Sequence, residues 1–282
     1  MEIAIKCGDA LELIKKQPDN SVDLIITSPP YMDMKNYGNE IENRTDENYV
    51  KWLLTLFVEV ERVLKPSGSF ILNINENCKK GLRSTIIFDL ISRNSVETKL
   101  KFYDYYIWHK KNAIPNSAAR RFRHNTEWIF HFCKDSKKMK FYMPRVLVPS
   151  VSGGKIQKII SQNRTIDGVQ SHIYRNKKMP TMARPDNVFR FNTAGASRDN
   201  TIKHPAPFNK ELPAYFINLL TDVNDLVIDT FSGIGTTGLA CKELNRNYIG
   251  YELHPPFVNF SRKRLNIQPA ITIKMNDIKI AA

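Results

Sequence analysis

Apolar and polar residues alternate along the first hundred positions in blocks that predict strands followed by helices. The stretch 22–27, Val-Asp-Leu-Ile-Ile-Thr, is a short apolar run that ends at Ser28-Pro29-Pro30, as a buried parallel strand would. Between 47 and 64, apolar residues recur at the three- and four-residue spacing of an amphipathic helix, which should end at 65–68, Lys-Pro-Ser-Gly. A second apolar run at 70–74 predicts another core strand.

The same alternation returns near the C-terminus. The pattern there predicts, in order, a helix over 212–220, a strand over 225–229, a helix over 237–244, a strand over 248–252 and a helix over 256–265. Strands that alternate with helices predict an α/β fold, with a doubly wound, mostly parallel sheet covered by helices on both faces. After Pro269 we expect a weakly ordered tail.

The middle of the chain differs in composition. Residues 101–200 contain 20 of the 42 Lys and Arg residues but 6 of the 28 Asp and Glu residues, so the net charge of +14 arises there. Short strand-like pieces at 126–132 and 187–191 lie among loops that mix aromatic and basic residues. A concentrated positive charge favours a polyanionic partner. Nucleic acid is favoured over a membrane, because no basic amphipathic helix is evident, and a solvated basic surface is the alternative.

The length of 282 residues suits one large α/β domain that carries an insertion. The expected parts are the two halves of that domain at 1–100 and 204–268, the basic insertion at 101–203 and the tail at 269–282. No apolar run approaches the roughly 18–20 residues that cross a bilayer, and the N-terminus lacks signal-peptide features, so a cytoplasmic protein without membrane contact is expected. The four cysteines are far apart and without CxxC pairs, which favours neither a metal site nor a disulfide framework.

A glycine-rich loop follows the strand expected at 225–229. Gly233, Gly235 and Gly238 match the pattern G-x-G-x-x-G, and Glu252 lies at the end of the next strand. Such glycines let the backbone approach a nucleotide-like ligand, and the acid can bind ribose hydroxyls, as in dinucleotide sites. Asp229 argues against a pyrophosphate, because like charges repel in a poorly solvated cleft. A ligand with an ammonium group and no phosphate, such as S-adenosylmethionine, would suit this carboxylate.

Thr27-Ser28-Pro29-Pro30-Tyr31 is the most specific motif in the chain. Two consecutive prolines fix φ and remove two backbone donors, so the strand must end and nearby carbonyls lack ladder partners. These carbonyls face the carboxyl edge of the sheet, where open α/β sheets bind ligands. The Ser28 hydroxyl and a carbonyl could hold an –NH₂ group while Tyr31 stacks on the ring that bears it. A Pro-Pro turn with a solvent-facing tyrosine is the alternative.

Together, the glycine loop and this motif resemble the amino-methyltransferases of DNA, a family that uses S-adenosyl-L-methionine and carries a [DNS]-P-P-[YFW] motif. The order of catalytic motif, basic module and cofactor loop is similar to the β-ordered group of that family and extends over nearly the whole chain. Cys7-Gly8-Asp9-Ala10 resembles its cofactor-adenine segment, 204–208 (His-Pro-Ala-Pro-Phe) resembles the element before its cofactor loop, and 108–112 and 125–127 resemble stretches that flank its target-recognition module.

The resemblance implies a Rossmann-like methyltransferase fold and three groups of site residues. The catalytic group is Ser28, Pro29, Pro30 and Tyr31. The cofactor-binding group is Asp9, Ala10, His204, Pro205, Phe208, Asp229, Phe231, Gly233, Gly235, Thr236, Thr237, Glu252 and Leu253. The densest basic run, Arg120, Arg121, Arg123 and His124, is expected to contact DNA phosphates. Simpler alternatives are a turn acid for Asp9, a surface histidine for His204 and a solvated loop for the basic run.

The implied reaction moves a methyl group from the sulfonium to the exocyclic amine of a base flipped out of double-stranded DNA, at an unstacking cost of about a few kcal/mol. Methylation of a ring carbon is disfavoured because it needs a cysteine nucleophile, and none of the four cysteines follows a proline. The Ser form of the motif and the 204–208 stretch resemble cytosine-N4 enzymes more than adenine-N6 enzymes. Cytosine N4 is therefore expected, with adenine N6 as the alternative.

Two other classes of protein stay open from the sequence. One is a nicotinamide-dependent oxidoreductase built on the same glycine pattern, and the other is a non-catalytic nucleic-acid-binding protein. The leading expectation is a sequence-specific DNA methyltransferase of a restriction-modification system, working in the cytoplasm at the nucleoid. The resemblance adds a separately acting restriction endonuclease and a second copy of the chain as candidate partners.

Overall fold

The computed structural model describes residues 1–30, 45–76, 78–79, 81–112, 120, 122–164, 170–193 and 209–267. The chain divides into two compact units, of which the larger comprises Met1–Phe141 with Asn187–Ala282 and the smaller comprises Tyr142–Asp186. The tail predicted at 269–282 lies outside the described residues.

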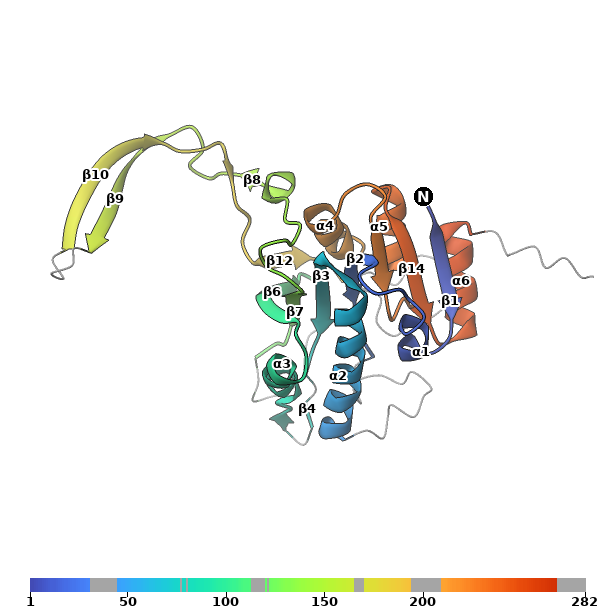
Figure 1. Ribbon diagram of the computed structural model, residues 1–282. Coiled ribbons are helices and arrows are strands. Elements are labelled where there is room, and N and C mark those ends of the chain that lie inside the picture. The colour runs from blue at the N-terminus through green and yellow to red at the C-terminus, as the bar shows by residue number, and fades with distance from the viewer. Residues whose placement is uncertain are drawn as a thin grey trace, which may run out of the picture. The chain divides into compact units, whose positions relative to one another are not determined.

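An eight-stranded sheet forms the centre of the larger unit (Figure 1). Its strands are, in spatial order, β1 (Ile3–Cys7), β14 (Asn247–Glu252), β13 (Leu226–Asp229), β2 (Val22–Thr27), β3 (Leu64–Ile74), β7 (Thr126–Cys133), β6 (Lys101–Lys110) and β12 (Val188–Phe191). Neighbouring strands are parallel, except that β7 runs antiparallel to both β3 and β6.

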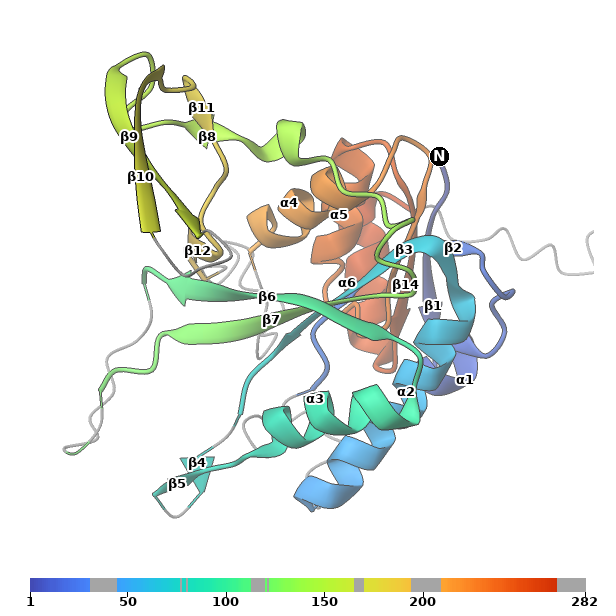
Figure 2. The same cartoon turned by 60° about the vertical axis from the view of Figure 1, so that its left-hand side comes forward.

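Helices cover both faces of this sheet (Figure 2). On one face lie α1 (Ala10–Ile14), α2 (Asp46–Val63) and α3 (Ile86–Glu97), and on the other lie α4 (Glu211–Leu220), α5 (Thr236–Glu243) and α6 (Pro255–Leu265). The doubly wound, mostly parallel α/β fold that the sequence predicts is therefore confirmed. The sequence pattern did not single out α3.

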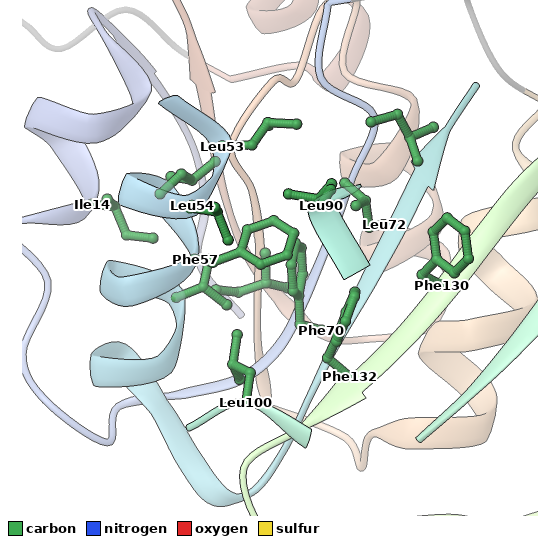
Figure 3. Packing of buried hydrophobic residues seen from close by; sticks show 14 of the residues in the cluster. Ile14, Leu53, Leu54, Phe57, Phe70, Leu72, Leu90, Leu100, Phe130 and Phe132 are labelled. Atoms are coloured by element: carbon green, nitrogen blue, oxygen red, sulfur yellow. The ribbon is translucent and has the colours of Figure 1, made fainter. Parts of the chain in front are cut away.

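The principal helix, α2, forms where the apolar spacing predicts it. The Thr45 side chain caps its first turn by accepting a hydrogen bond from the Asn48 backbone N–H at 3.2 Å, and Asp46 and Glu47 complement the helix dipole. Its apolar face packs on the sheet, where Phe57 meets Phe70 edge-to-face with ring centroids 5.0 Å apart (Figure 3). The residues of β2 are buried along the whole strand, as a central parallel strand requires.

The basic middle of the chain takes part in two different structures. Strands β6, β7 and β12 fall within the predicted insertion, 101–203, but they belong to the central sheet. Tyr106 of β6 and Phe189 of β12 pack on Phe216 of α4, with ring centroids 5.3 and 5.5 Å from it. The smaller compact unit, Tyr142–Asp186, is therefore shorter than the predicted insertion.

Within this smaller unit, a 3-10 turn (Met143–Val146) is followed by two strand pairs. β8 (Val148–Pro149) pairs with β11 (Met182–Ala183), and β9 (Ile156–Arg164) pairs with β10 (Gln170–Lys178) in a long curved ribbon (Figure 1). In the larger unit, a further short pair joins β4 (Cys78–Lys79) to β5 (Leu82–Arg83). Across the parts of the chain that the structure describes, no helix has the length and apolar character needed to cross a membrane.

Replacing Phe57 by alanine should destabilise the fold strongly, because its fully buried ring contacts both Phe70 and Phe132. The loss expected from burial and the cavity left behind is about 3–5 kcal/mol in the free energy of unfolding. Val58→Ala, on the next residue of the same helix but 47% exposed, is the control and should change the value by less than about 1 kcal/mol. Urea denaturation followed by circular dichroism measures both, and equal losses would contradict the packing described.

Candidate active site at the carboxyl edge of the sheet

Two distant segments meet where β2 and β13 end. The strands are adjacent and parallel, with Leu24 opposite Val227 and Ile25 opposite Ile228, so their carboxyl ends lie side by side. There the Thr27 hydroxyl donates to the Asp229 carboxylate at 2.7 Å, in a buried contact between residues 202 positions apart. Ser28-Pro29-Pro30 and the glycine loop thus leave the sheet from the same edge. A shared site for the two motifs requires this convergence.

Asp229 is fully buried and enclosed by hydrogen-bond donors. Its Oδ1 accepts bonds from the Thr27 hydroxyl and from the Phe231 backbone N–H at 3.1 Å, and its Oδ2 accepts from the Thr237 hydroxyl at 2.6 Å. Burial raises the pKa of this carboxyl to about 6, although these donors oppose the rise. Asp229 therefore holds the loop and the start of α5 in place. The contact with a ligand's ammonium group that its charge suggested stays a prediction.

The glycine loop turns between Asp229 and α5 under close packing. Gly235 has φ of 75°, the left-handed region that glycine adopts without strain, and it forms the N-cap of α5. A Cβ on Gly238 would lie 2.7 Å from the Tyr248 ring, so a larger residue would push α5 away from β14. The loop carbonyl of Gly233 accepts a hydrogen bond from the Ser261 hydroxyl of α6 at 2.7 Å. The backbone angle of Gly235 and the packing at Gly238 thus account for two of the three glycines in the motif.

Glu252 closes the other side of the loop. It lies at the end of β14, where one carboxylate oxygen accepts from the Gly233 N–H and the other from the His254 N–H, each at 2.9 Å. Strand β1 pairs alongside with Cys7 opposite Glu252, and this register brings Asp9 to the same edge. The Asp9 carboxylate caps α1 by accepting from the N–H groups of Leu11 and Glu12 at 2.9 and 3.1 Å. Asp9 is thus a capping acid at the edge where Glu252 and the glycine loop also lie.

Some of the remaining predicted cofactor residues lie at this edge, and the others fall in segments that the structure does not describe. Ala10 is buried in α1, Thr236 is buried at the start of α5, and Leu253 is 45% exposed just after β14. His204, Pro205 and Phe208 lie outside the described residues.

The predicted catalytic motif continues directly from β2. Ser28 and Pro30 are half-buried and Pro29 is buried, while Tyr31 lies outside the described residues. Because Thr27 is opposite Leu72 in the neighbouring strand β3, Ser28 follows at the same edge as the end of β3. The structure thus brings the described residues of the catalytic group next to the cofactor group.

The predicted DNA-contacting run belongs to the connection between β6 and β7. Because β6 ends at Lys110 and the antiparallel β7 begins at Thr126, this connection leaves the sheet at its carboxyl edge. Arg120 and Arg123 are exposed. His124 is half-buried with its Nε2 3.7 Å from the Glu76 carboxylate, and burial lowers its pKa. Arg121 lies outside the described residues.

Comparison with known proteins identifies the family. Residues 22–263 match the family model described as DNA methylase. The chain belongs to this DNA methylase family.

Individual relatives extend over most of the chain. The type II methyltransferase M.PvuII of Proteus hauseri is 28% identical, with 96% of this chain and 86% of the relative covered. The DNA adenine methyltransferase YhdJ of Escherichia coli is 29% identical, with 92% and 81% covered.

Solved structures confirm the fold of this methylase. The PvuII DNA methyltransferase (cytosine-N4-specific) superposes with a TM-score of 0.72 at 24% identity, over 96% of this chain and 88% of that chain. The complex of M1.HpyAVI with S-adenosylmethionine superposes with a TM-score of 0.59 at 25% identity, over 94% and 100%. The Rossmann-like methyltransferase fold and the family resemblance predicted from the sequence are both confirmed.

Several residues that hold the candidate site in place have no recognisable signal in the sequence. Ser261 and Arg264 of α6 bond the loop carbonyls of Gly233 and Ile234, but α6 carries no motif that would reveal this. Tyr49 and Trp52 belong to the apolar spacing that predicts α2, and in the structure Tyr49 bonds the Pro30 carbonyl while Trp52 contacts the Phe231 ring. Their spacing predicts burial and gives no sign of the partners.

The buried carboxyl of Asp229 makes a testable contribution to the pH dependence of stability. Its pKa of about 6 in the folded methylase lies above the value of about 3.9 for an exposed aspartate, so the folded state binds the proton more tightly. Relative to Asp229→Asn, the free energy of unfolding of the unchanged protein should therefore fall by roughly 2–3 kcal/mol between pH 4 and pH 7. Urea titrations of both proteins across that range measure this difference in the free energy of unfolding. The contributions of other titrating groups are common to both proteins and cancel. A difference that rises with pH would contradict the assignment.

Proposed function

We propose that this DNA methylase transfers a methyl group from S-adenosyl-L-methionine to the N4 amine of a cytosine flipped out of double-stranded DNA. The observation that carries the proposal is the junction of Thr27 with Asp229, with oxygens 2.7 Å apart. This junction joins Ser28-Pro29-Pro30 to the glycine loop, so the acceptors of an amine and the loop of a nucleoside-bearing cofactor share one edge.

The residues at this edge fit S-adenosyl-L-methionine better than a dinucleotide. The loop is flanked by two buried carboxylates, Asp229 and Glu252, which would repel a pyrophosphate and favour a cationic ligand. Glu252 can accept further bonds from ribose hydroxyls, because a carboxylate offers about four acceptor positions. Asp9 and Ala10 would lie against the adenine. Superposition with a methyltransferase bound to S-adenosylmethionine supports this assignment. It disfavours the nicotinamide-dependent alternative.

The catalytic role falls to Ser28 and the Pro29 carbonyl. The cofactor supplies an electrophilic methyl group. The exocyclic amine of cytosine is a weak nucleophile because its lone pair is delocalised into the ring. When Ser28 Oγ and the Pro29 carbonyl accept hydrogen bonds from the two N–H groups of the amine, the nitrogen becomes more tetrahedral. Its lone pair is then available to attack the methyl group. Transfer of the methyl group from sulfur to this nitrogen would leave a surplus proton on the amine. That proton would pass to the Ser28 hydroxyl, which would release its own proton to water, while the Pro29 carbonyl accepts a hydrogen bond from the remaining N–H. Such preorganised acceptors act electrostatically.

Cytosine is favoured over adenine as the target base. Ser28 occupies the first position of the motif, where adenine enzymes more often carry aspartate, and the similar PvuII structure is described as cytosine-N4-specific. Adenine N6 is the alternative, because YhdJ, a relative of comparable identity, is described as a DNA adenine methyltransferase. Both amines present similar hydrogen-bonding geometry to the acceptors.

Within the basic middle of the chain, 101–203, the parts that lie outside the central sheet are proposed to recognise the DNA. These parts include the loop that carries Arg120, Arg123 and His124 and the separate unit Tyr142–Asp186. The type II methyltransferase relatives support a proposed role in restriction-modification, in which an endonuclease would act separately. The nucleoid would then be its place of action, and a second copy of the chain is a candidate partner.

Ser28→Ala should lower methyl transfer at least 100-fold, because it removes one of two acceptors that activate the amine. Binding of S-adenosylmethionine should stay within twofold. Tritium transfer to unmethylated bacterial genomic DNA, followed by nucleoside mass spectrometry, measures rate and product together. Ser95→Ala, at an exposed position of α3, is the matched control and should leave the rate unchanged.

The product of the same assay decides between the proposals. N4-methylcytosine is expected. Detection of N6-methyladenine instead would show that adenine is the target base. The absence of any methylated base would overturn the proposed activity.

Arg120→Gln should weaken DNA binding and make it less dependent on salt. If Arg120 contacts a phosphate, losing its charge lowers the slope of log K against log salt by about one unit. Fluorescence anisotropy with a duplex at several salt concentrations measures the slope. Arg93→Gln is the control, because Arg93 on α3 is paired with Glu97 at 2.8 Å and should not affect binding. An unchanged slope for Arg120→Gln would remove this residue from the DNA contact.

A further inference from the structure

A buried tyrosine of α2 contacts the backbone of the proposed catalytic motif. Tyr49 lies in the first turn of α2 and is 1% exposed. Its hydroxyl donates a hydrogen bond to the Pro30 carbonyl oxygen at 2.9 Å. Because prolines have no N–H group, the backbone of Pro29-Pro30 can be anchored through its carbonyls. Tyr49 provides such an anchor at the second proline.

This bond restrains the direction in which the chain leaves the motif. The proline ring already holds φ near −65°, so ψ is the soft backbone dihedral of Pro30. The orientation of the Pro30 carbonyl is set by ψ, and a donor fixed in α2 therefore limits ψ. The same bond holds Pro30 itself in place, and the Pro29 carbonyl belongs to the planar peptide that ends at the Pro30 nitrogen. Anchoring Pro30 therefore also restrains the position of that carbonyl.

The neighbouring aromatic residue of α2 reaches the other motif. Trp52 lies one turn after Tyr49, and their ring centroids are 5.6 Å apart. Trp52 also contacts the ring of Phe231, again with centroids 5.6 Å apart. The Phe231 backbone N–H bonds Thr27 and Asp229, both at 3.1 Å. One face of α2 thus touches the proposed catalytic motif through Tyr49 and the cofactor loop through Trp52.

We infer that Tyr49 is a positioning residue of the methyl-transfer reaction and that Trp52 sets the cofactor loop beside it. The inference rests on the proposed function, since it concerns the alignment of the amine acceptors with the methyl donor. Reaction rates fall steeply when reacting groups are misplaced by about 1 Å. Loss of the hydroxyl therefore affects the rate of transfer, whereas loss of the indole affects the binding of S-adenosylmethionine through Phe231.

Tyr49→Phe tests the hydroxyl alone, because the variant keeps the ring and its contact with Trp52. The kcat for DNA methylation should fall about tenfold, the effect of one hydrogen bond on a barrier, while KM for S-adenosylmethionine changes less than twofold. Tyr106→Phe is the matched control. That tyrosine is 8% exposed and its hydroxyl bonds the His131 ring at 3.3 Å, so it also loses a buried hydroxyl. Its kcat should stay within twofold of the unchanged protein.

Trp52→Leu supplies the second arm of the experiment. Calorimetric titration with S-adenosylmethionine in the absence of DNA should show Kd raised about fivefold or more, with Tyr49→Phe unchanged in the same titration. Each kcat is normalised to the fraction of protein that binds the cofactor, so that partial unfolding does not imitate a catalytic defect.

Three outcomes would overturn the inference. A normalised rate for Tyr49→Phe within twofold of the unchanged protein would exclude positioning by the hydroxyl. An equal loss of rate in Tyr106→Phe would show that the effect comes from losing any buried hydroxyl and not from positioning. An unchanged Kd of Trp52→Leu for S-adenosylmethionine would show that Trp52 does not set the cofactor loop. If the unchanged protein methylates DNA in any of these cases, the proposed function stands. Failure of the unchanged protein to methylate DNA would overturn the proposed function, and this inference with it.

Discussion

The hydrogen bond between Thr27 and Asp229 is the constraint on which the candidate site depends. Both side chains are buried, and a buried carboxylate without partners would be strongly destabilising, so the fold must supply donors to Asp229. These donors are the Thr27 hydroxyl at the end of β2, the Phe231 backbone N–H in the loop and the Thr237 hydroxyl at the start of α5. One carboxylate thereby ties a strand end, a loop and a helix start together. Because the Asp229 carboxyl is buried away from water, its pKa is raised.

The neighbouring contacts extend this junction in two directions. On one side, Ser261 and Arg264 of α6 bond loop carbonyls, and Glu252 bonds the Gly233 N–H, so the loop is held from both its carbonyl and its amide groups. On the other side, Tyr49 and Trp52 of α2 contact Pro30 and Phe231. Both proposed reactants would therefore meet backbone that is already held by contacts with neighbouring helices and strands, which favours an aligned transfer.

The elements with a strong apolar pattern could be predicted from the sequence. In a buried parallel strand such as β2 and an amphipathic helix such as α2, the order of apolar residues itself indicates which side chains are buried. The sequence was also sufficient for the convergence of the two motifs, since parallel strands end at one edge. It could not show that β6, β7 and β12 join the sheet, because their aromatic and basic residues resemble those of the insertion. The enclosure of Asp229 and the partner of Tyr49 depend on contacts with segments distant in the sequence, which no local pattern records.

The distribution of charge separates the two proposed ligands of this methylase. S-adenosylmethionine carries a sulfonium and an ammonium group, and the edge proposed to bind it presents the carboxylates of Asp9, Asp229 and Glu252 from the nearly neutral ends of the chain. DNA is a polyanion, and the excess of Lys and Arg lies in the middle. A phosphate backbone would be repelled from an edge of carboxylates unless it were held elsewhere. The segregation of charge thus favours binding of the duplex by the basic segment, with only the uncharged base entering the acidic edge. That arrangement suits the acceptors at Ser28 and Pro29, which recognise a neutral amine.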